Sequence, residues 1–125
     1  METYKIAGSE DTPEITLDKA SGTFSISGRS LPEDVVTFYK PTLDWLSGFG
    51  ENPNPEMNFE IKLEYFNTAS SKLLLDILMK LDEIAEGKGT KITIGWHYDK
   101  DDDDMLEAGE EYSELVSIPF AMKPY

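Results

Sequence analysis

Three hydroxyl side chains, Thr68, Ser70 and Ser71, stand where a strand-like segment runs into a helix-like segment. The first amides of a helix have no acceptor within the helix, and the helix dipole adds partial positive charge there, so such a junction favours an anion. A hydroxyl at this place either caps the helix or accepts a phosphate that the helix end tolerates. Asn67 and Thr68 are both suitable caps, so the local pattern leaves the two roles open.

A second group of candidate residues is the acidic segment that begins at Asp99. Its members fall at the ligand spacing of an EF-hand calcium loop, and they are Asp99, Asp101, Asp103, Met105, Glu107 and Glu110. Asp104 occupies the position at which that loop needs glycine, and a strand instead of a helix precedes the segment. A calcium- or ligand-binding module that uses Asp99–Glu110 is therefore the alternative to a solvated run of charges.

No set of residues typical of an active site assembles elsewhere in the sequence. The single histidine, His97, falls on the polar side of a strand, and a metal site needs several ligands. Gly87–Thr90 (GKGT) shares letters with a phosphate-binding loop, but it follows a helix and precedes a strand, which is the reverse of the required order. Because no nucleophile–base pair is visible, we expect a protein that is not an enzyme and that uses no cofactor or metal.

The elements that position these residues are read from the spacing of apolar side chains. Alternation predicts strands over Tyr4–Ala7, Glu14–Lys19, Thr23–Ser27, Asn58–Tyr65, Lys91–Tyr98 and Leu115–Phe120. Helical spacing predicts three helices. The first is capped by Ser30 and Glu33 and ends at Gly48 and Gly50. The second covers Thr68–Glu86, and the short third covers Met105–Tyr112. Pro41 should kink or break the first helix.

The strand patterns also predict the class of the fold. Every strand alternates apolar with polar residues, and none is the continuous apolar run that a doubly covered parallel sheet requires. We therefore predict an α/β fold with a single mixed sheet and helices mainly on one face. In the central strand, Phe59, Ile61, Leu63 and Tyr65 should be buried, and Glu60, Lys62 and Glu64 should be accessible.

Composition narrows the classes of function. The chain of 125 residues, 39% of them hydrophobic, fits one globular domain over 1–125. Its net charge of −14, from 25 acidic and 11 basic residues, provides no basic footprint for nucleic acid and disfavours anionic membranes. There is no cysteine for disulfide or thiol chemistry, and the first residues lack the apolar core of a signal peptide, so we expect a cytoplasmic protein.

Several segments together resemble one known family. They are GRSLPED (Gly28–Asp34), FYKPTLDWL (Phe38–Leu46), YFNTASSKLLLDIL (Tyr65–Leu78), the WHYD…ML…AGEEY pattern between Trp96 and Tyr112, and the late IPF of Ile118–Phe120. In this order, and over nearly the whole chain, they are similar to SiaC-type bacterial regulatory phosphoproteins. None of the motifs is catalytic.

The resemblance implies both a fold and a mode of action. Such proteins are similar to anti-sigma-factor antagonists of the STAS type, in which a hydroxyl at the start of a helix that follows a strand is phosphorylated. The family's modified threonine corresponds to Thr68, with Asn67, Ser70 and Ser71 as supporting residues. The implied partners are a protein kinase of the GHKL type, a PP2C-like phosphatase and a downstream target. In some bacteria that target is a diguanylate cyclase, which the unphosphorylated form binds and activates. The implied function is a non-enzymatic phosphoswitch in a partner-switching pathway.

Overall fold

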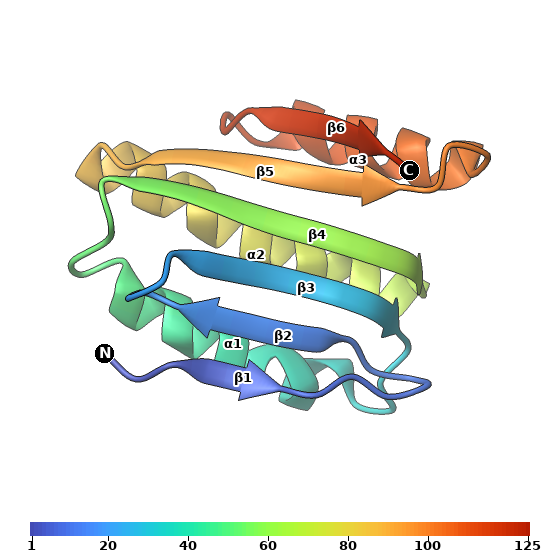
Figure 1. The fold of residues 1–125 in the computed structure, drawn as a ribbon, viewed down its shortest axis with the longest axis horizontal. Coiled ribbons are helices and arrows are strands. Elements are labelled where there is room, and N and C mark those ends of the chain that lie inside the picture. The colour runs from blue at the N-terminus through green and yellow to red at the C-terminus, as the bar shows by residue number, and fades with distance from the viewer.

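The structure, a computed structural model, describes all of residues 1–125 as strands and helices joined by short connections (Figure 1). The strands are β1 (Tyr4–Ile6), β2 (Glu14–Asp18), β3 (Thr23–Ser30), β4 (Glu56–Phe66), β5 (Lys91–Tyr98) and β6 (Phe120–Pro124). The helices are α1 (Val35–Phe49), α2 (Thr68–Lys88) and α3 (Asp103–Leu115). No helix combines the length and the apolar character needed to cross a membrane.

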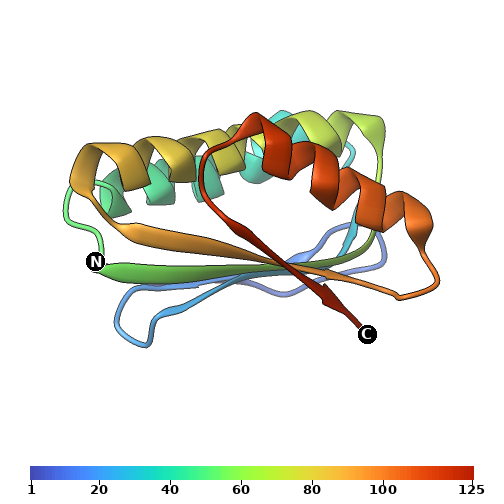
Figure 2. The same ribbon diagram turned by 90° about the horizontal axis from the view of Figure 1, so that it is seen from above.

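The six strands form one mixed sheet in the order β1-β2-β3-β4-β5-β6. The first three strands pair antiparallel, whereas β3 to β6 pair parallel, with α1, α2 and α3 as the crossovers between successive parallel strands. Crossovers of this kind keep one hand, and the parallel strands advance in one direction, so the three helices fall on the same face of the sheet. Figure 2 shows this single layer of helices and confirms the predicted fold class.

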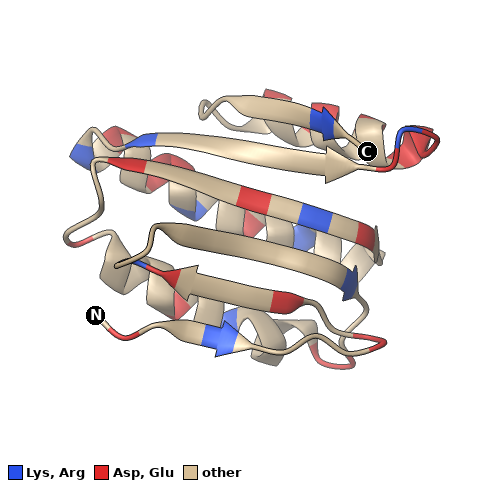
Figure 3. Cartoon of the chain, in the orientation of Figure 1, with Lys and Arg blue, Asp and Glu red and all other residues tan.

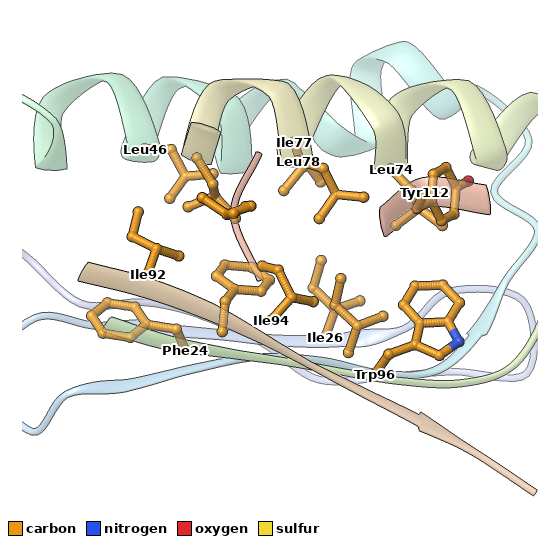
Figure 4. Packing of buried hydrophobic residues seen from close by; sticks show 14 of the residues in the cluster. Phe24, Ile26, Leu46, Leu74, Ile77, Leu78, Ile92, Ile94, Trp96 and Tyr112 are labelled. Carbon is orange, nitrogen blue, oxygen red and sulfur yellow. The ribbon is translucent and has the colours of Figure 1, made fainter. Parts of the chain in front are cut away.

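The hydrophobic core lies between the helices and the covered face of the sheet (Figure 4). Leu74, Ile77 and Leu78 extend from α2 toward Ile26 of β3 and Ile94 of β5. Each of these five side chains is fully buried. The burial of apolar area at about 25 cal/mol per Å² is the main term that holds α2, and therefore its first turn, against the sheet.

A β-bulge in β4 overturns one predicted burial. Phe59, Ile61 and Leu63 are buried as expected, but Tyr65 is exposed and Phe66 packs against the core instead. Gly28 of β3 pairs with Leu63 and the next residue of β3 pairs with Tyr65, so Glu64 is an extra residue in β4. One extra residue reverses the facing of everything after it, which explains why the alternation failed at this point.

Helix α1 begins later than predicted and is longer than the proline suggested. Its N-cap is Asp34, whose carboxylate accepts the Thr37 N–H at 3.2 Å, so the capping box of Ser30 and Glu33 was wrong. The predicted break at Pro41 is also wrong, because the helix continues to Phe49. The carbonyl that Pro41 leaves without an N–H partner is that of Thr37, and both residues are exposed, so water can satisfy it.

The C-terminal elements also differ from their predicted bounds. Leu115 is the last residue of α3, and β6 begins at Phe120, so the predicted strand Leu115–Phe120 was misplaced. The connecting segment buries Ile118, whose apolar character imitated a strand pattern. The predicted edge location near Pro119 holds, since β6 pairs only with β5.

Charged residues recur along β4 (Figure 3). They alternate with the buried residues that face the helices, so their side chains project from the opposite face of the sheet. Lys62 and Glu64 are exposed as predicted, whereas Glu60 is half-buried. The Glu60 carboxylate lies over Gly95, 3.1 Å from Nε2 of His97 and 3.0 Å from Nζ of Lys123. His97 is therefore held by a carboxylate on the open face.

Candidate functional site

The junction between β4 and α2 is closed by Asn67. This residue has an extended backbone (φ −85°, ψ 174°), and its Oδ1 atom accepts the Ser70 N–H at 2.8 Å. Its carbonyl accepts the Ser71 N–H at 3.0 Å, which is the first bond of the helical pattern. Asn67 is thus the N-cap, and Thr68, the other candidate cap, is the first residue of the helix.

Thr68 is exposed, and its hydroxyl forms no hydrogen bond within the chain. The N–H groups of Thr68 and Ala69 also have no protein acceptor, because Asn67 takes only the N–H groups further along. Two free amides therefore stand beside a free hydroxyl at the positive end of a 21-residue helix. An anion at such a place gains about 0.3–1 kcal/mol from the helix dipole.

Ser70 is fully buried and takes part in a chain of hydroxyl groups. Its Oγ donates to the carbonyl of Ser30 at 2.9 Å and accepts from the Ser30 Oγ at 2.9 Å. The Ser30 Oγ in turn lies 2.6 Å from the hydroxyl of Tyr39. These bonds tie the first turn of α2 to β3 and α1. Burial, opposed in part by the bond to Ser30, raises the pKa of Tyr39 to about 12.

Ser71 faces the other side of the turn, and it connects α2 to α3. Its Oγ donates to the carbonyl of Thr68 at 2.7 Å, and its own carbonyl accepts from the Tyr112 hydroxyl at 2.8 Å. Burial, opposed in part by this bond, raises the pKa of Tyr112 to about 12. Asn67, Ser70 and Ser71 thus bind the backbone and neighbours of the first turn, and none of them contacts the Thr68 hydroxyl.

The hydroxyl chain was missed at the sequence level because Ser30 looked like a helix cap. A buried tyrosine hydroxyl needs a partner, so Tyr39 on the apolar side of α1 was the available signal. The partner could not be named from the sequence, because Ser30 and Ser70 lie forty positions apart and meet only when β3 and β4 pair in parallel.

The acidic segment after β5 takes a form that does not match a calcium loop. Asp99 accepts the Asp101 N–H at 2.9 Å, and Asp102 caps α3 by accepting the Met105 N–H at 3.0 Å. Asp103, Glu107 and Glu110 belong to α3, and no three acidic or histidine side chains are grouped so that they could hold a metal ion.

At the position where a calcium loop uses a backbone carbonyl, the Met105 carbonyl accepts from the Trp96 indole at 3.0 Å. The acidic side chains line a hollow of about 720 Å³ beside the end of β4, with Leu63 and Tyr125 as its apolar members. Figure 3 shows the concentration of acidic residues in this turn.

Comparison with known proteins agrees with the order and geometry of these elements. A family model described as SiaC family regulatory phosphoprotein matches residues 6–125. This chain belongs to that family. An uncharacterised protein of Pseudomonas aeruginosa is 33% identical to it over 125 residues, which are 100% of this chain and 98% of the relative.

Solved structures of SiaC from Pseudomonas aeruginosa share the fold. Apo-SiaC is 33% identical with a TM-score of 0.89, over 98% of this chain and 99% of that one. A second SiaC structure has a TM-score of 0.90 at 33% identity and covers 100% of both chains. A third, 32% identical with a TM-score of 0.89 over 98% of this chain and 99% of that one, shows SiaC as the activator in complex with the diguanylate cyclase SiaD.

Proposed function

We propose that this protein is a phosphoswitch in a bacterial partner-switching pathway and that Thr68 is the residue that carries the phosphate. A kinase of the GHKL type adds the phosphate, and a PP2C-like phosphatase removes it. The unphosphorylated form binds the downstream target, for which a diguanylate cyclase is our candidate. Because the family is one of regulatory phosphoproteins, we assign the chain a binding role and not a catalytic one, in the cytoplasm.

The observation that carries this proposal is the contrast among the three hydroxyls. Thr68 is exposed and its hydroxyl is free, whereas Ser70 is fully buried in the chain of bonds to Ser30. The Ser71 hydroxyl is half-buried and bound to the Thr68 carbonyl. A kinase needs a hydroxyl that can enter its active site without unfolding the substrate, so Thr68 is the acceptor that the folded chain offers.

The electrostatics at the start of α2 favour a phosphate on Thr68, which the helix can carry without unfolding. A phosphate adds about −1.5 to −2 charges at pH 7, and the free amides of Thr68 and Ala69 can donate to its oxygens. On a chain that already carries −14 the global field changes little, so the switch must act locally. A partner that packs over the first turn of α2 would have to desolvate the phosphate, and this cost would exclude it.

The test is phosphorylation by a purified GHKL-type kinase from the same bacterium, followed by peptide mapping and measurement of target affinity for both forms. We expect phosphate on Thr68 alone and an affinity for the target that falls at least tenfold, which corresponds to about 1.4 kcal/mol. Thr68→Ala should remain unmodified and bind the target constitutively, and Ser71→Ala is the matched control that should still be modified. Phosphate on Ser70 or Ser71, or equal affinity of the two forms, would refute the proposal.

The cation-binding alternative that uses Asp99–Glu110 receives no support from the arrangement of that segment. Its side chains cap and brace the start of α3, and Glu110 stands on the helix, away from the turn. We therefore do not advance it as a second function.

A further inference from the structure

Two exposed apolar side chains, Met79 on α2 and Leu115 at the end of α3, line one hollow on the helical side of the molecule. Met79 is 55% exposed and Leu115 is 63% exposed. The hollow has a volume of about 410 Å³. We call it the α2–α3 groove. Neither side chain contributes to the core, so the groove offers apolar surface that the fold itself does not use.

The rim of the α2–α3 groove is acidic. Its charged lining residues are Asp76, Lys80, Asp82, Glu83 and Glu86. Lys80 is the single base among them, and its Nζ lies 3.9 Å from Glu83. Asp82 accepts the Ser117 N–H at 3.2 Å and so holds the segment that follows α3. All of these acids belong to α2, and Asp76 and Glu86, which lie before and after Met79 along the helix, form no ion pair within the chain.

We propose that the α2–α3 groove is a docking site for a basic amphipathic helix of a partner protein. Apolar anchors that enter a preformed groove supply most of the affinity of such contacts, and Met79 is a side chain that adapts to different anchors. The carboxylates along α2 are complementary to Lys or Arg beside those anchors, which gives the contact its orientation and its rate of association. Acidic or uncharged helices lack that complementarity.

This inference goes beyond the phosphoswitch because the groove is remote from Thr68. Met79 lies about three turns further along α2, roughly 16 Å from Thr68 at 1.5 Å per residue. Docking in the groove is therefore open to the partner whether or not Thr68 is modified, and it is expected to be unchanged in Thr68→Ala. The two proposals can fail separately.

The test uses a fluorescently labelled peptide of about 14 residues, made of leucine and lysine at helical spacing. Its affinity for the protein is measured by anisotropy at physiological salt, with a leucine–glutamate peptide of the same pattern as the control. We expect the Met79→Ser/Leu115→Ser variant to bind the basic peptide at least tenfold more weakly than the wild type. Val36→Ser removes an apolar side chain of similar exposure (62%) on α1 and should leave the affinity unchanged.

A second pair of variants separates the groove from general attraction to an acidic protein. Glu83→Gln/Glu86→Gln should weaken binding several-fold, whereas Glu107→Gln/Glu111→Gln, which removes two exposed acids from α3, should have a smaller effect. The proposal is wrong if both charge pairs act equally or if the apolar variant keeps full affinity. It is also wrong if sedimentation shows a dimer that Met79→Ser/Leu115→Ser dissociates, because a second copy would then occupy the groove.

Discussion

Replacing Ser70 by alanine tests whether the buried hydroxyl chain fixes the turn that carries Thr68. The substitution removes the donor to the Ser30 carbonyl and the acceptor of the Ser30 hydroxyl, both at 2.9 Å. The Ser30 carbonyl keeps the Asn67 N–H at 3.2 Å, so the group left without a partner is the Ser30 hydroxyl hydrogen. If the Ser30 hydroxyl donated to Tyr39 instead, the hydroxyl hydrogen of Tyr39 would be the one left without an acceptor.

The expected loss of stability follows from these bonds. A lost hydrogen bond costs about 1 kcal/mol, and a buried donor without an acceptor costs about 1–3 kcal/mol. The higher helix propensity of alanine offsets at most about 0.5 kcal/mol of this loss in the free energy of unfolding. We therefore expect Ser70→Ala to lower the free energy of unfolding by about 2 kcal/mol, or to lower Tm by roughly 8 °C for a chain of this size.

Urea unfolding followed by tryptophan fluorescence measures this change, with an unchanged m-value as the sign that only stability was altered. Thr68→Ala is the matched control, because the Thr68 hydroxyl is exposed and unbonded, and its effect should stay within about 0.5 kcal/mol. In a double-mutant cycle, Ser30→Ala and Ser70→Ala should show a coupling of about 1 kcal/mol. Additive effects, or a Ser70→Ala protein as stable as the wild type, would refute the structural role of the chain.

Two further predictions concern α3 and the ends of α2. A Cβ at Gly109 would lie 2.5 Å from the ring of Trp96, so Gly109→Ala should cost about 1–3 kcal/mol in urea unfolding, whereas Gly87→Ala, at an open helical position, should add about 0.5–1 kcal/mol. Burial, opposed in part by the bond to Ser71, raises the pKa of Tyr112 from 10.0 to about 12. Stabilisation from the neutral phenol is therefore complete below pH 10 and lost as the pH rises toward 12. Tyr112→Phe should show a shallower alkaline decline of stability, and an identical decline would contradict this.

The candidate site shows which features of the β4–α2 junction can be predicted from the local sequence pattern and which cannot. A strand that alternates up to Leu63, followed by NTASSK and a helical stripe, was sufficient to predict the helix start at Thr68. The pattern could not choose between Asn67 and Thr68 as the cap, because both side chains can accept a backbone N–H. It also could not rank the three hydroxyls by exposure. Ser70 and Ser71 are identical in type and adjacent in sequence, and only packing against β3 buries one of them.

The sequence by itself determined the α/β class, the open face of the sheet and the helix start that carries the three hydroxyls, because each depends on periodicity or capping chemistry within a short segment. The choice of Thr68 among those hydroxyls came from the family resemblance. Tertiary structure decided what depends on pairing between distant segments. The bulge at Glu64 exists only in the register of β3 against β4, and it turns Tyr65 to solvent. The bond between Ser30 and Ser70, and the groove between Met79 and Leu115, likewise arise only when separate elements pack together.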